Sequence, residues 1–181
     1  EFAQGVLGLT PESAAQLDYV LVPHSHIHML DFVRPHTVTS HHDVAKHMLS
    51  TFNDMVVRGI ATIVAHPFDP CGMEQPENIT GIFSYLSDEE LENSFGLAAE
   101  NHVGIEVNLS IFNGNYHAPY YQDSYLRMFD IAKRMGCTFS IGSDSHSLEA
   151  FTERNSGFDE VVELLGLQEE NMVELVRRQT A

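Results

Sequence analysis

Residues 137–146, with the sequence CTFSIGSDSH, join a short apolar stretch to an aspartate and a histidine. The apolar stretch predicts a buried strand, so Asp144 and His146 lie where the strand ends and a loop begins. Because they are two positions apart in extended chain, both side chains can point inward while Ser145 points away. A carboxylate and an imidazole could then bind one metal ion, although an isolated Asp-x-His pair more often caps a turn. The rest of the chain decides between these interpretations.

An apolar strand followed by polar residues recurs along the chain, and segments with apolar residues at helical spacing separate the strands. Strands that alternate with helices form parallel β-α-β units, and near-continuous apolar strands indicate a sheet that is covered on both faces or closed into a barrel. The predicted strands are residues 18–22, 60–65, 103–107 and 137–141, with the end of an earlier strand within 1–9. The predicted helices are residues 10–17, 40–58, 79–86, 87–99, 121–135, 157–165 and 168–178.

Length and composition are those of one α/β domain. The chain has 181 residues, of which 43% are hydrophobic, so it can bury roughly 70% of its unfolded surface without disulfides. It contains neither a Gly-x-Gly-x-x-Gly loop nor a Gly-x-x-x-x-Gly-Lys loop, which excludes the two commonest nucleotide sites of open sheets. We therefore predict a single domain over residues 1–181.

The chain is strongly acidic, with 9 Lys and Arg against 26 Asp and Glu and a formal charge of −17. Such a charge repels phosphate backbones, so we expect no general nucleic-acid binding. A small anionic substrate could still bind where metal ions supply positive charge. Cys71 and Cys137 form no disulfide framework, which favours a reduced, cytoplasmic protein with two buried or incidental thiols. No apolar run has the length of a membrane span and no signal peptide is recognisable, so we expect no membrane partner.

Metal-competent side chains follow each of the four predicted strands. Because parallel barrel strands open their carboxyl ends on one face, we expect these side chains to lie together. A single histidine there is more often a structural hydrogen-bonding residue, but four such endings favour a metal site. Imidazole and carboxylate without thiolate suit zinc, manganese or iron. In strand order, the residues are His24, His26 and His28; His66; Glu106, for which we favour a structural hydrogen bond, and Asn108; and Asp144 and His146.

Four blocks of the chain, in order, resemble the PHP (polymerase and histidinol phosphatase) domain family. The resemblance spans nearly the whole chain, and its last two blocks are the more specific. It implies a distorted TIM-like barrel of seven β/α units, here without its first strands, and a phosphoesterase with two or three divalent metal ions. The blocks are DYVLV (18–22) leading to His26, IVAHP (63–67), GIEVN (104–108) and GSDSH (142–146).

The resemblance also implies a set of metal ligands. An extra residue precedes the first of them, so His24 and His28 remain rivals of His26. Glu1 matches the bridging glutamate of a Gly-x-Glu strand end, unless it belongs to a cloning scar. The family's amino-terminal His-x-His motif is absent here. If it lies upstream of Glu1 the metal site is complete, and if it does not, at least one metal ion lacks most of its ligands. The implied ligands are Glu1, His26, His66, Asp144 and His146.

The function that follows is hydrolysis of a small phosphorylated metabolite or nucleotide by metal-activated water. Two neighbouring ions activate water near neutral pH and stabilise the attacking and leaving oxygens. We expect Asp144 and His146 to act at the metal centre and name Arg34 as the candidate for contacting the phosphate, although a solvated surface arginine is the more common case. Further candidates with the same alternative are Arg154, Tyr116 and His117.

Two other functions remain open. A metal-dependent amidohydrolase uses the same ligand types, but the order of the motifs and the lack of a candidate carbamylated lysine count against it. A catalytically silent PHP-like scaffold has no need of Asp144 and His146. The sequence does not determine the oligomeric state, and an oligomer is possible. The remaining histidines are expected to be exposed or at helix ends, namely His41, His42, His47 and His102.

Overall fold

Four parallel strands form the central sheet of the computed structural model, which describes residues 2–3, 6–24, 26–73, 75–113 and 119–174. The strands lie side by side in the order in which they occur in the chain. One row across the sheet pairs Val22 with Val64, Val64 with Ile105 and Ile105 with Phe139. The strands are β3 (Leu21–Pro23), β4 (Ile63–Ala65), β5 (Gly104–Asn108) and β6 (Phe139–Gly142).

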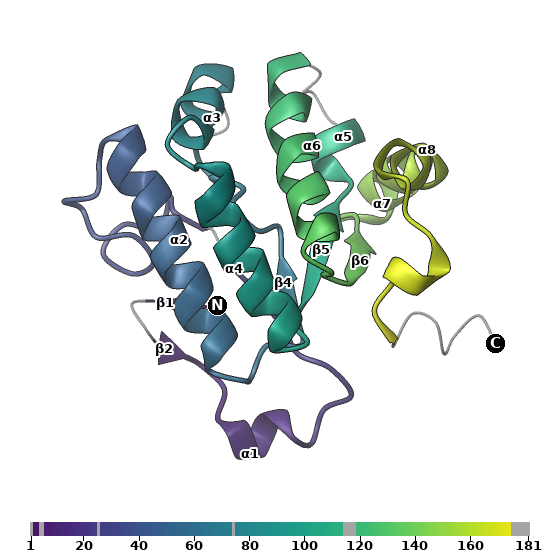
Figure 1. Ribbon diagram of the computed structural model, residues 1–181, viewed down its shortest axis with the longest axis horizontal. Coiled ribbons are helices and arrows are strands. Elements are labelled where there is room, and N and C mark those ends of the chain that lie inside the picture. The colour runs from purple at the N-terminus through teal and green to yellow at the C-terminus, as the bar shows by residue number, and fades with distance from the viewer. Residues whose placement is uncertain (1, 4–5, 25, 74, 114–118, 175–181) are drawn as a thin grey trace.

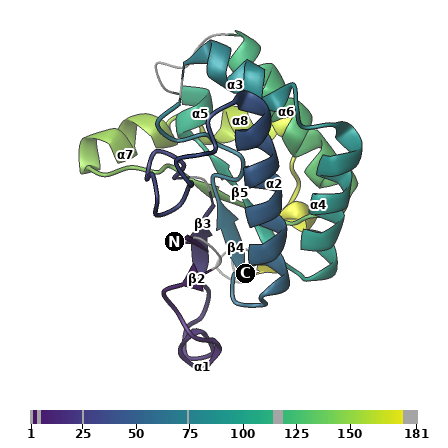
Figure 2. The same cartoon turned by 90° about the vertical axis from the view of Figure 1, so that its left-hand side faces the viewer.

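Three long helices cover one face of this sheet: α2 (His41–Val57), α4 (Asp88–Glu100) and α6 (Pro119–Arg134). Neighbouring helices pack against one another, α2 on α4 and α4 on α6, in front of the strands in Figure 1 and to one side of them in Figure 2. Right-handed crossovers between adjacent strands give this arrangement, whereas a doubly wound sheet reverses its strand order and carries helices on both faces. The sheet therefore combines sequential strand order with long helices on one face.

Shorter elements complete the described chain. A two-stranded antiparallel hairpin precedes the sheet, and a 3-10 helix follows the last α-helix. These elements are β1 (Phe2–Ala3), β2 (Val6–Leu7), α1 (Pro11–Ala14), α3 (Pro76–Phe83), α5 (Ser110–Asn113), α7 (Leu148–Asn155), α8 (Phe158–Leu165) and η1 (Glu169–Asn171).

Three of the helices begin at a residue whose side chain caps the first turn. Thr10, Ser40 and Ser87 each accept a backbone N–H of the first turn, at α1, α2 and α4 respectively. Glu90 completes a capping box at α4 by accepting the backbone N–H of Ser87. Side-chain acceptors at these positions satisfy amide groups that the helix itself leaves unpaired.

The hydrophobic core lies between the sheet and the three long helices. Strand residues in alternate positions, such as Ile105 and Val107 of β5, join it, as expected for a strand whose side chains alternate between two faces. Its centre is aromatic: Phe52, Phe68 and Phe95 contact one another with ring centroids 5.1–5.9 Å apart. The segment that follows β4 is therefore fixed against helices α2 and α4.

The prediction of a mixed α/β fold with a parallel sheet is confirmed, and some boundaries are corrected. The first strand begins at Leu21 and not at residue 18, because the Val20 N–H bonds to the Thr62 hydroxyl outside the regular ladder. The helices α5 and α7 were not predicted. Of the predicted helix 168–178, residues 168–173 are not α-helical, Glu174 is helical, and residues 175–178 lie outside the described residues. The 3-10 helix η1 forms at Glu169–Asn171, and Met172 then pairs in parallel with Phe139 at the edge of the sheet.

Tertiary packing explains this last difference. Val173 donates its N–H to the carbonyl of Phe139 at 2.9 Å and presses its side chain against Gly104, where an added Cβ would lie 2.5 Å from Val173 Cγ1. Burial of this valine against the sheet outweighs a modest helix preference. Among the described residues, no helix combines the length and apolar character needed to cross a membrane.

Candidate metal centre

The chain turns sharply where β4 ends, in the sequence HPFDP. His66 and Phe68 have positive φ angles of 33° and 57°, a left-handed region that is unfavourable for residues with a side chain. Pro67 and Pro70 prevent continuation of the strand because they lack a backbone N–H. Packing of Phe68 in the aromatic core holds this strained turn, and His66 is thereby buried at the carboxyl end of the sheet.

Three metal-competent side chains converge at this turn. His26, His66 and Cys71 each offer one ligand atom, and these atoms all lie within 4.8 Å of one another. The two imidazole rings stack with centroids 5.1 Å apart. The Cys71 carbonyl accepts the backbone N–H of His28 at 3.1 Å, which ties the segment after β4 to the segment after β3. The cluster is therefore built from two loops that hydrogen bonds hold together.

The residue types and spacing fit one zinc ion. Zinc binds histidine nitrogen at about 2.0–2.1 Å and cysteine sulfur at about 2.3 Å, which puts tetrahedral ligand atoms roughly 3.3–3.6 Å apart. The ligand atoms of the cluster all lie within 4.8 Å of one another, which is compatible with that geometry after small side-chain rotations. Three protein ligands leave a fourth position for water or substrate, the arrangement found in catalytic zinc sites rather than in structural ones.

His24 is separated from this cluster by its hydrogen bonds. Its Nε2 donates to the Met48 carbonyl at 2.8 Å, and its Nδ1 accepts the Phe68 N–H at 3.2 Å. Burial lowers the pKa of His24 to about 3, so the ring is neutral at physiological pH. Both ring nitrogens of His24 are therefore engaged in hydrogen bonds to the backbone and are not available to a metal ion. Of the three rival histidines after β3, His26 is the one that joins His66, and His28 places Nδ1 3.3 Å from the Cys71 carbonyl.

Glu106 connects the ends of β4 and β6. Its Oε2 accepts the backbone N–H of His66 at 2.8 Å, which is the structural hydrogen bond expected for a glutamate inside this strand. Its Oε1 lies where a side chain on residue 142 would be, since a Cβ added to Gly142 would be 2.0 Å away. Burial, and secondarily the negative charge of Asp144, raise the pKa of Glu106. A buried carboxylate thus stands directly beside the cluster.

Asn108 adds a buried amide next to Glu106. It pairs in register with Gly142, and its Oδ1 accepts the Ser110 N–H at 2.9 Å. Its Nδ2 is buried and has no hydrogen-bond partner among the described residues. An unpaired buried donor is unfavourable, so this amide is suited to meet a ligand oxygen.

Asp144 Oδ1 and His146 Nε2 lie 3.5 Å apart. Asp144, two residues after β6, has a positive φ of 50°, and the side chain of His146 is 90% exposed, contrary to the expected inward orientation. Neither residue belongs to the group of His26 and His66. The structure therefore brings two of the predicted ligands into one cluster and places the Asp-x-His pair outside it, with Glu106 between them.

Other predicted site residues have structural contacts or lie outside the described residues. Arg34 donates from Nε to the Ile27 carbonyl at 2.7 Å and from a terminal nitrogen to the Val38 carbonyl, so it braces the loop after β3. His41 and His47 are partly buried and hydrogen-bonded, contrary to the expected exposure, whereas His42 is exposed. Glu1, Tyr116 and His117 lie outside the described residues, and Arg154 lies in α7 without a described side chain.

Cys71 is the member of the cluster that the sequence interpretation missed, because it was taken for a buried or incidental thiol. A usable signal was present. Cys71 follows His66 by five residues, and the two intervening prolines force the chain to fold back after the strand. A cysteine just beyond such a turn can return to the histidine that precedes it.

Comparison of this chain with protein-family models, curated proteins and solved structures finds no match. The chemistry of the site therefore follows from its own residues. Two imidazoles and a thiolate bind zinc well, and the neighbouring carboxylates of Glu106 and Asp144 add negative charge that favours further cations.

Proposed function

We propose that this protein is a metal-dependent phosphoesterase of the PHP type that hydrolyses a small phosphorylated metabolite or nucleotide. The observation that carries the proposal is the convergence of His26, His66 and Cys71 beside Glu106 at the carboxyl end of a parallel sheet. Ligands of open α/β sheets and of β/α barrels bind at this end of the strands.

The fold supports a barrel of PHP type. The strands follow in sequence order, the long helices share one face, and the parallel pairing of Met172 with Phe139 extends the same order beyond β6. The four blocks that resemble the family include His66, Glu106 and Asp144.

Cys71 makes zinc the preferred ion of this cluster, since thiolates favour zinc over manganese. When bound, the ion supplies Lewis-acid chemistry, because it lowers the pKa of water and polarises a phosphoryl oxygen. Asp144 and His146 offer a carboxylate and an imidazole for a further divalent ion nearby. The formal charge of −17 makes such cations necessary for an anionic substrate, all the more because Arg34 is engaged by two carbonyls.

The residues around the cluster have separate roles in the reaction. Glu106 fixes the backbone of His66, and the Asn108 Nδ2 is placed to donate to a phosphoryl oxygen. In the overall step, the oxygen of water bonds to phosphorus while the ester P–O bond breaks. The products are phosphate and an alcohol that leaves with a proton, so no redox partner is required.

The test is phosphate release from small phosphomonoesters by the full chain loaded with zinc or manganese. We expect His26→Ala and Cys71→Ser to lower kcat/KM by at least about 100-fold, since each removes one of three ligands. His36→Ala is the matched control, because His36 is an exposed histidine bonded to Asp31 away from the cluster. Unchanged activity in both ligand variants would overturn the proposal. Hydrolysis of amides alone would support an amidohydrolase, and a protein that neither binds metal nor hydrolyses would be a scaffold.

A further inference from the structure

A cavity of about 490 Å³ lies at the carboxyl ends of β5 and β6, against helices α7 and α8. Its volume is in the range of small-molecule sites. Its lining is mainly apolar, with two polar side chains, and consists of Leu109, Ile141, Gly142, Ser143, Phe151, Asn155 and Phe158.

The lining of this cavity suits an aromatic group without charge. Phe151 on α7 and Phe158 on α8 are 50% and 41% exposed, so both leave ring surface unpacked beside the cavity. None of the described lining residues is charged, and the Ser143 hydroxyl and the Asn155 amide each offer hydrogen-bond donors and acceptors. Aromatic rings gain from stacking or edge contacts with phenylalanine beyond simple burial. A charged group would lose its hydration there without gaining a partner.

The cavity adjoins the candidate metal centre through two residues. Gly142 lines the cavity and also adjoins Glu106, whose Oε1 would be 2.0 Å from a Cβ at that position. Glu106 in turn accepts the backbone N–H of His66. The Leu109 N–H donates to the Gly142 carbonyl at 2.7 Å, so the rim between the two sites is fixed by the strand pairing. The cavity and the cluster thus lie along the same edge of the sheet, with Gly142 and Glu106 between them.

We propose that this cavity binds the leaving group of the substrate and that the leaving group carries an uncharged aromatic ring, either a nucleobase or an aryl group. This inference rests on the proposed phosphoesterase function and adds the substrate class. Phe151 and Phe158 select the ring, and Asn155 distinguishes a nucleobase from a plain aryl group by hydrogen bonds to its edge.

The experiment compares kcat/KM of the metal-loaded full chain for benzyl phosphate, cyclohexylmethyl phosphate and ethyl phosphate. The three alcohols are similar in leaving-group basicity and differ in the ring. We expect benzyl phosphate to exceed ethyl phosphate by about tenfold or more, with cyclohexylmethyl phosphate between them. Phe151→Leu should lower the value for benzyl phosphate by about tenfold and leave that for ethyl phosphate unchanged. Phe32→Leu is the control, because Phe32 is 51% exposed and does not line the cavity.

A further pair of measurements distinguishes the two aromatic sources. Asn155→Ala should lower kcat/KM for adenosine 5′-phosphate and not for benzyl phosphate if the ring is a nucleobase, and it should affect neither if the ring is a plain aryl group. Equal values for the three simple esters, or an equal loss for all of them in Phe151→Leu, would overturn the inference while leaving the phosphoesterase intact.

Failure of the proposed function gives a different result, namely no hydrolysis of any ester. The cavity is then tested alone by calorimetry with adenosine and with benzyl alcohol. Binding that weakens about tenfold in Phe151→Leu supports an aromatic site, and absent or unchanged binding overturns it.

Discussion

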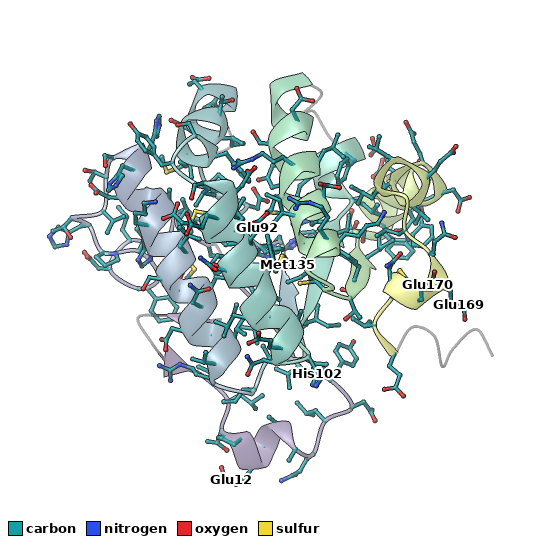
Figure 3. The ribbon with its side chains drawn as sticks, viewed as in Figure 1. Glu12, Glu92, His102, Met135, Glu169 and Glu170 are labelled. Carbon is teal, nitrogen blue, oxygen red and sulfur yellow. The ribbon has the colours of Figure 1, made fainter. Side chains whose placement is uncertain are left out.

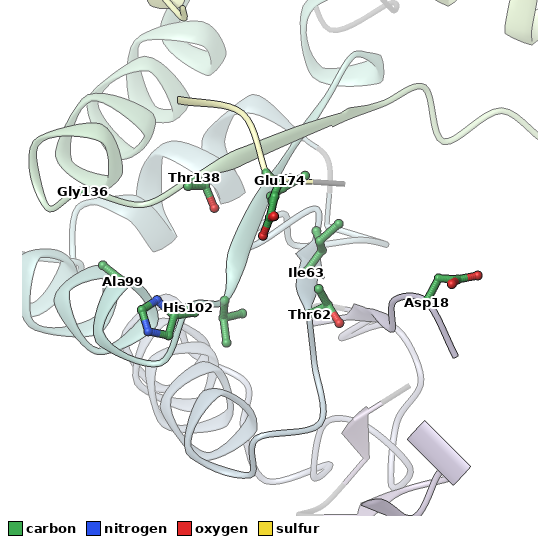
Figure 4. A pocket seen from close by; sticks show the side chains of 10 residues that line it. Asp18, Thr62, Ile63, Ala99, His102, Gly136, Thr138 and Glu174 are labelled. Atoms are coloured by element: carbon green, nitrogen blue, oxygen red, sulfur yellow. The ribbon is translucent and has the colours of Figure 1, made fainter. Parts of the chain in front are cut away.

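The two ends of the parallel sheet both carry histidine, acidic groups and a cavity, yet only one of them brings potential metal-ligand atoms close together among the described residues. At the amino end, a cavity of about 400 Å³ is lined by residues that include Asp18, Thr62, His102, Thr138 and Glu174 (Figure 4). At the carboxyl end, His26, His66 and Cys71 bring their ligand atoms within 4.8 Å of one another. Among the described residues, that convergence is found at the carboxyl end alone.

Backbone conformation at the two ends shows the same difference. His102, labelled in Figure 3 at the end of α4, has a positive φ of 56°, as is common where a helix terminates. His66 and Asp144 have positive φ just after strands, where it is unusual. Strain that the surrounding structure maintains is frequent at functional sites. A cavity lined by polar residues is therefore weaker evidence for a functional site than ligand atoms that a strained backbone holds close together.

The largest expected contrast is between the two cysteines, one at each end. Burial raises the pKa of Cys137, just before β6, from 9.0 to about 12, whereas Cys71 is partly exposed. Since the thiolate is the reactive form, alkylation of the folded protein at pH 8 should modify Cys71 about 1,000-fold faster than Cys137. Peptide mass mapping after iodoacetamide treatment measures both rates. Added zinc should protect Cys71, and comparable labelling of both thiols would remove the contrast.

Next in size is the effect of a histidine at each end on zinc affinity. His66→Ala removes one of three ligands and should weaken zinc binding by at least about 100-fold in competition with a chromophoric chelator. His102→Ala removes a histidine from the polar cavity at the amino end and should leave the affinity unchanged. Equal losses in the two variants would show that the ends do not differ in this way.

The pH dependence of stability separates the same two ends through His24. The folded pKa of His24 is lowered to about 3 by burial, whereas the unfolded chain takes up this proton near pH 6.5. The contribution of His24 to the free energy of unfolding is therefore fully present above pH 6.5 and is lost as the pH falls toward 3. Urea unfolding with a chelator present should show about 2 kcal/mol lost to this group between pH 7.5 and pH 5. His24→Gln should have a shallower pH dependence, and His102→Gln should match the parent; no change in slope for His24→Gln would contradict the assignment.

The smallest contrast concerns two glycines. Gly142→Ala places a methyl group against the Glu106 carboxylate, so it should disturb the hydrogen bond to His66 and weaken zinc binding by about tenfold. Gly136→Ala meets open space but must adopt a φ of 84°, so it should lower the free energy of unfolding by about 1 kcal/mol without changing zinc affinity. Chelator competition and urea unfolding on both variants check this, and the reverse pattern would contradict the role of Glu106.

Much of the fold followed from local patterns. The apolar strands and the helically spaced segments between them predicted a parallel α/β sheet, as the structure has it. The helices α5 and α7 were missed because their sequences are short and weakly periodic. The extended pairing of Met172 depends on contact with β6, which no local pattern reports.

The site was predictable at its strand ends and not beyond them. His66 and the Glu106 hydrogen bond lie where the strand pattern placed them. His24 is kept out of the metal site by hydrogen bonds to the Met48 carbonyl and the Phe68 N–H. Both of these groups are distant from His24 in sequence, so the preference for His26 could not be predicted from local pattern. Cys71 reaches the cluster because the turn containing Pro67 and Pro70 folds the chain back toward His66. Residue spacing alone does not predict this approach.

Cobalt substitution tests the central claim, that His26, His66 and Cys71 bind one metal ion, most directly. One equivalent of Co²⁺ per chain should produce the near-ultraviolet thiolate-to-cobalt charge-transfer band that a cysteine ligand causes. The band should disappear in Cys71→Ser and persist in Cys137→Ser. Stoichiometric binding with the same band in Cys71→Ser, or no stoichiometric binding by the parent protein, would contradict the account.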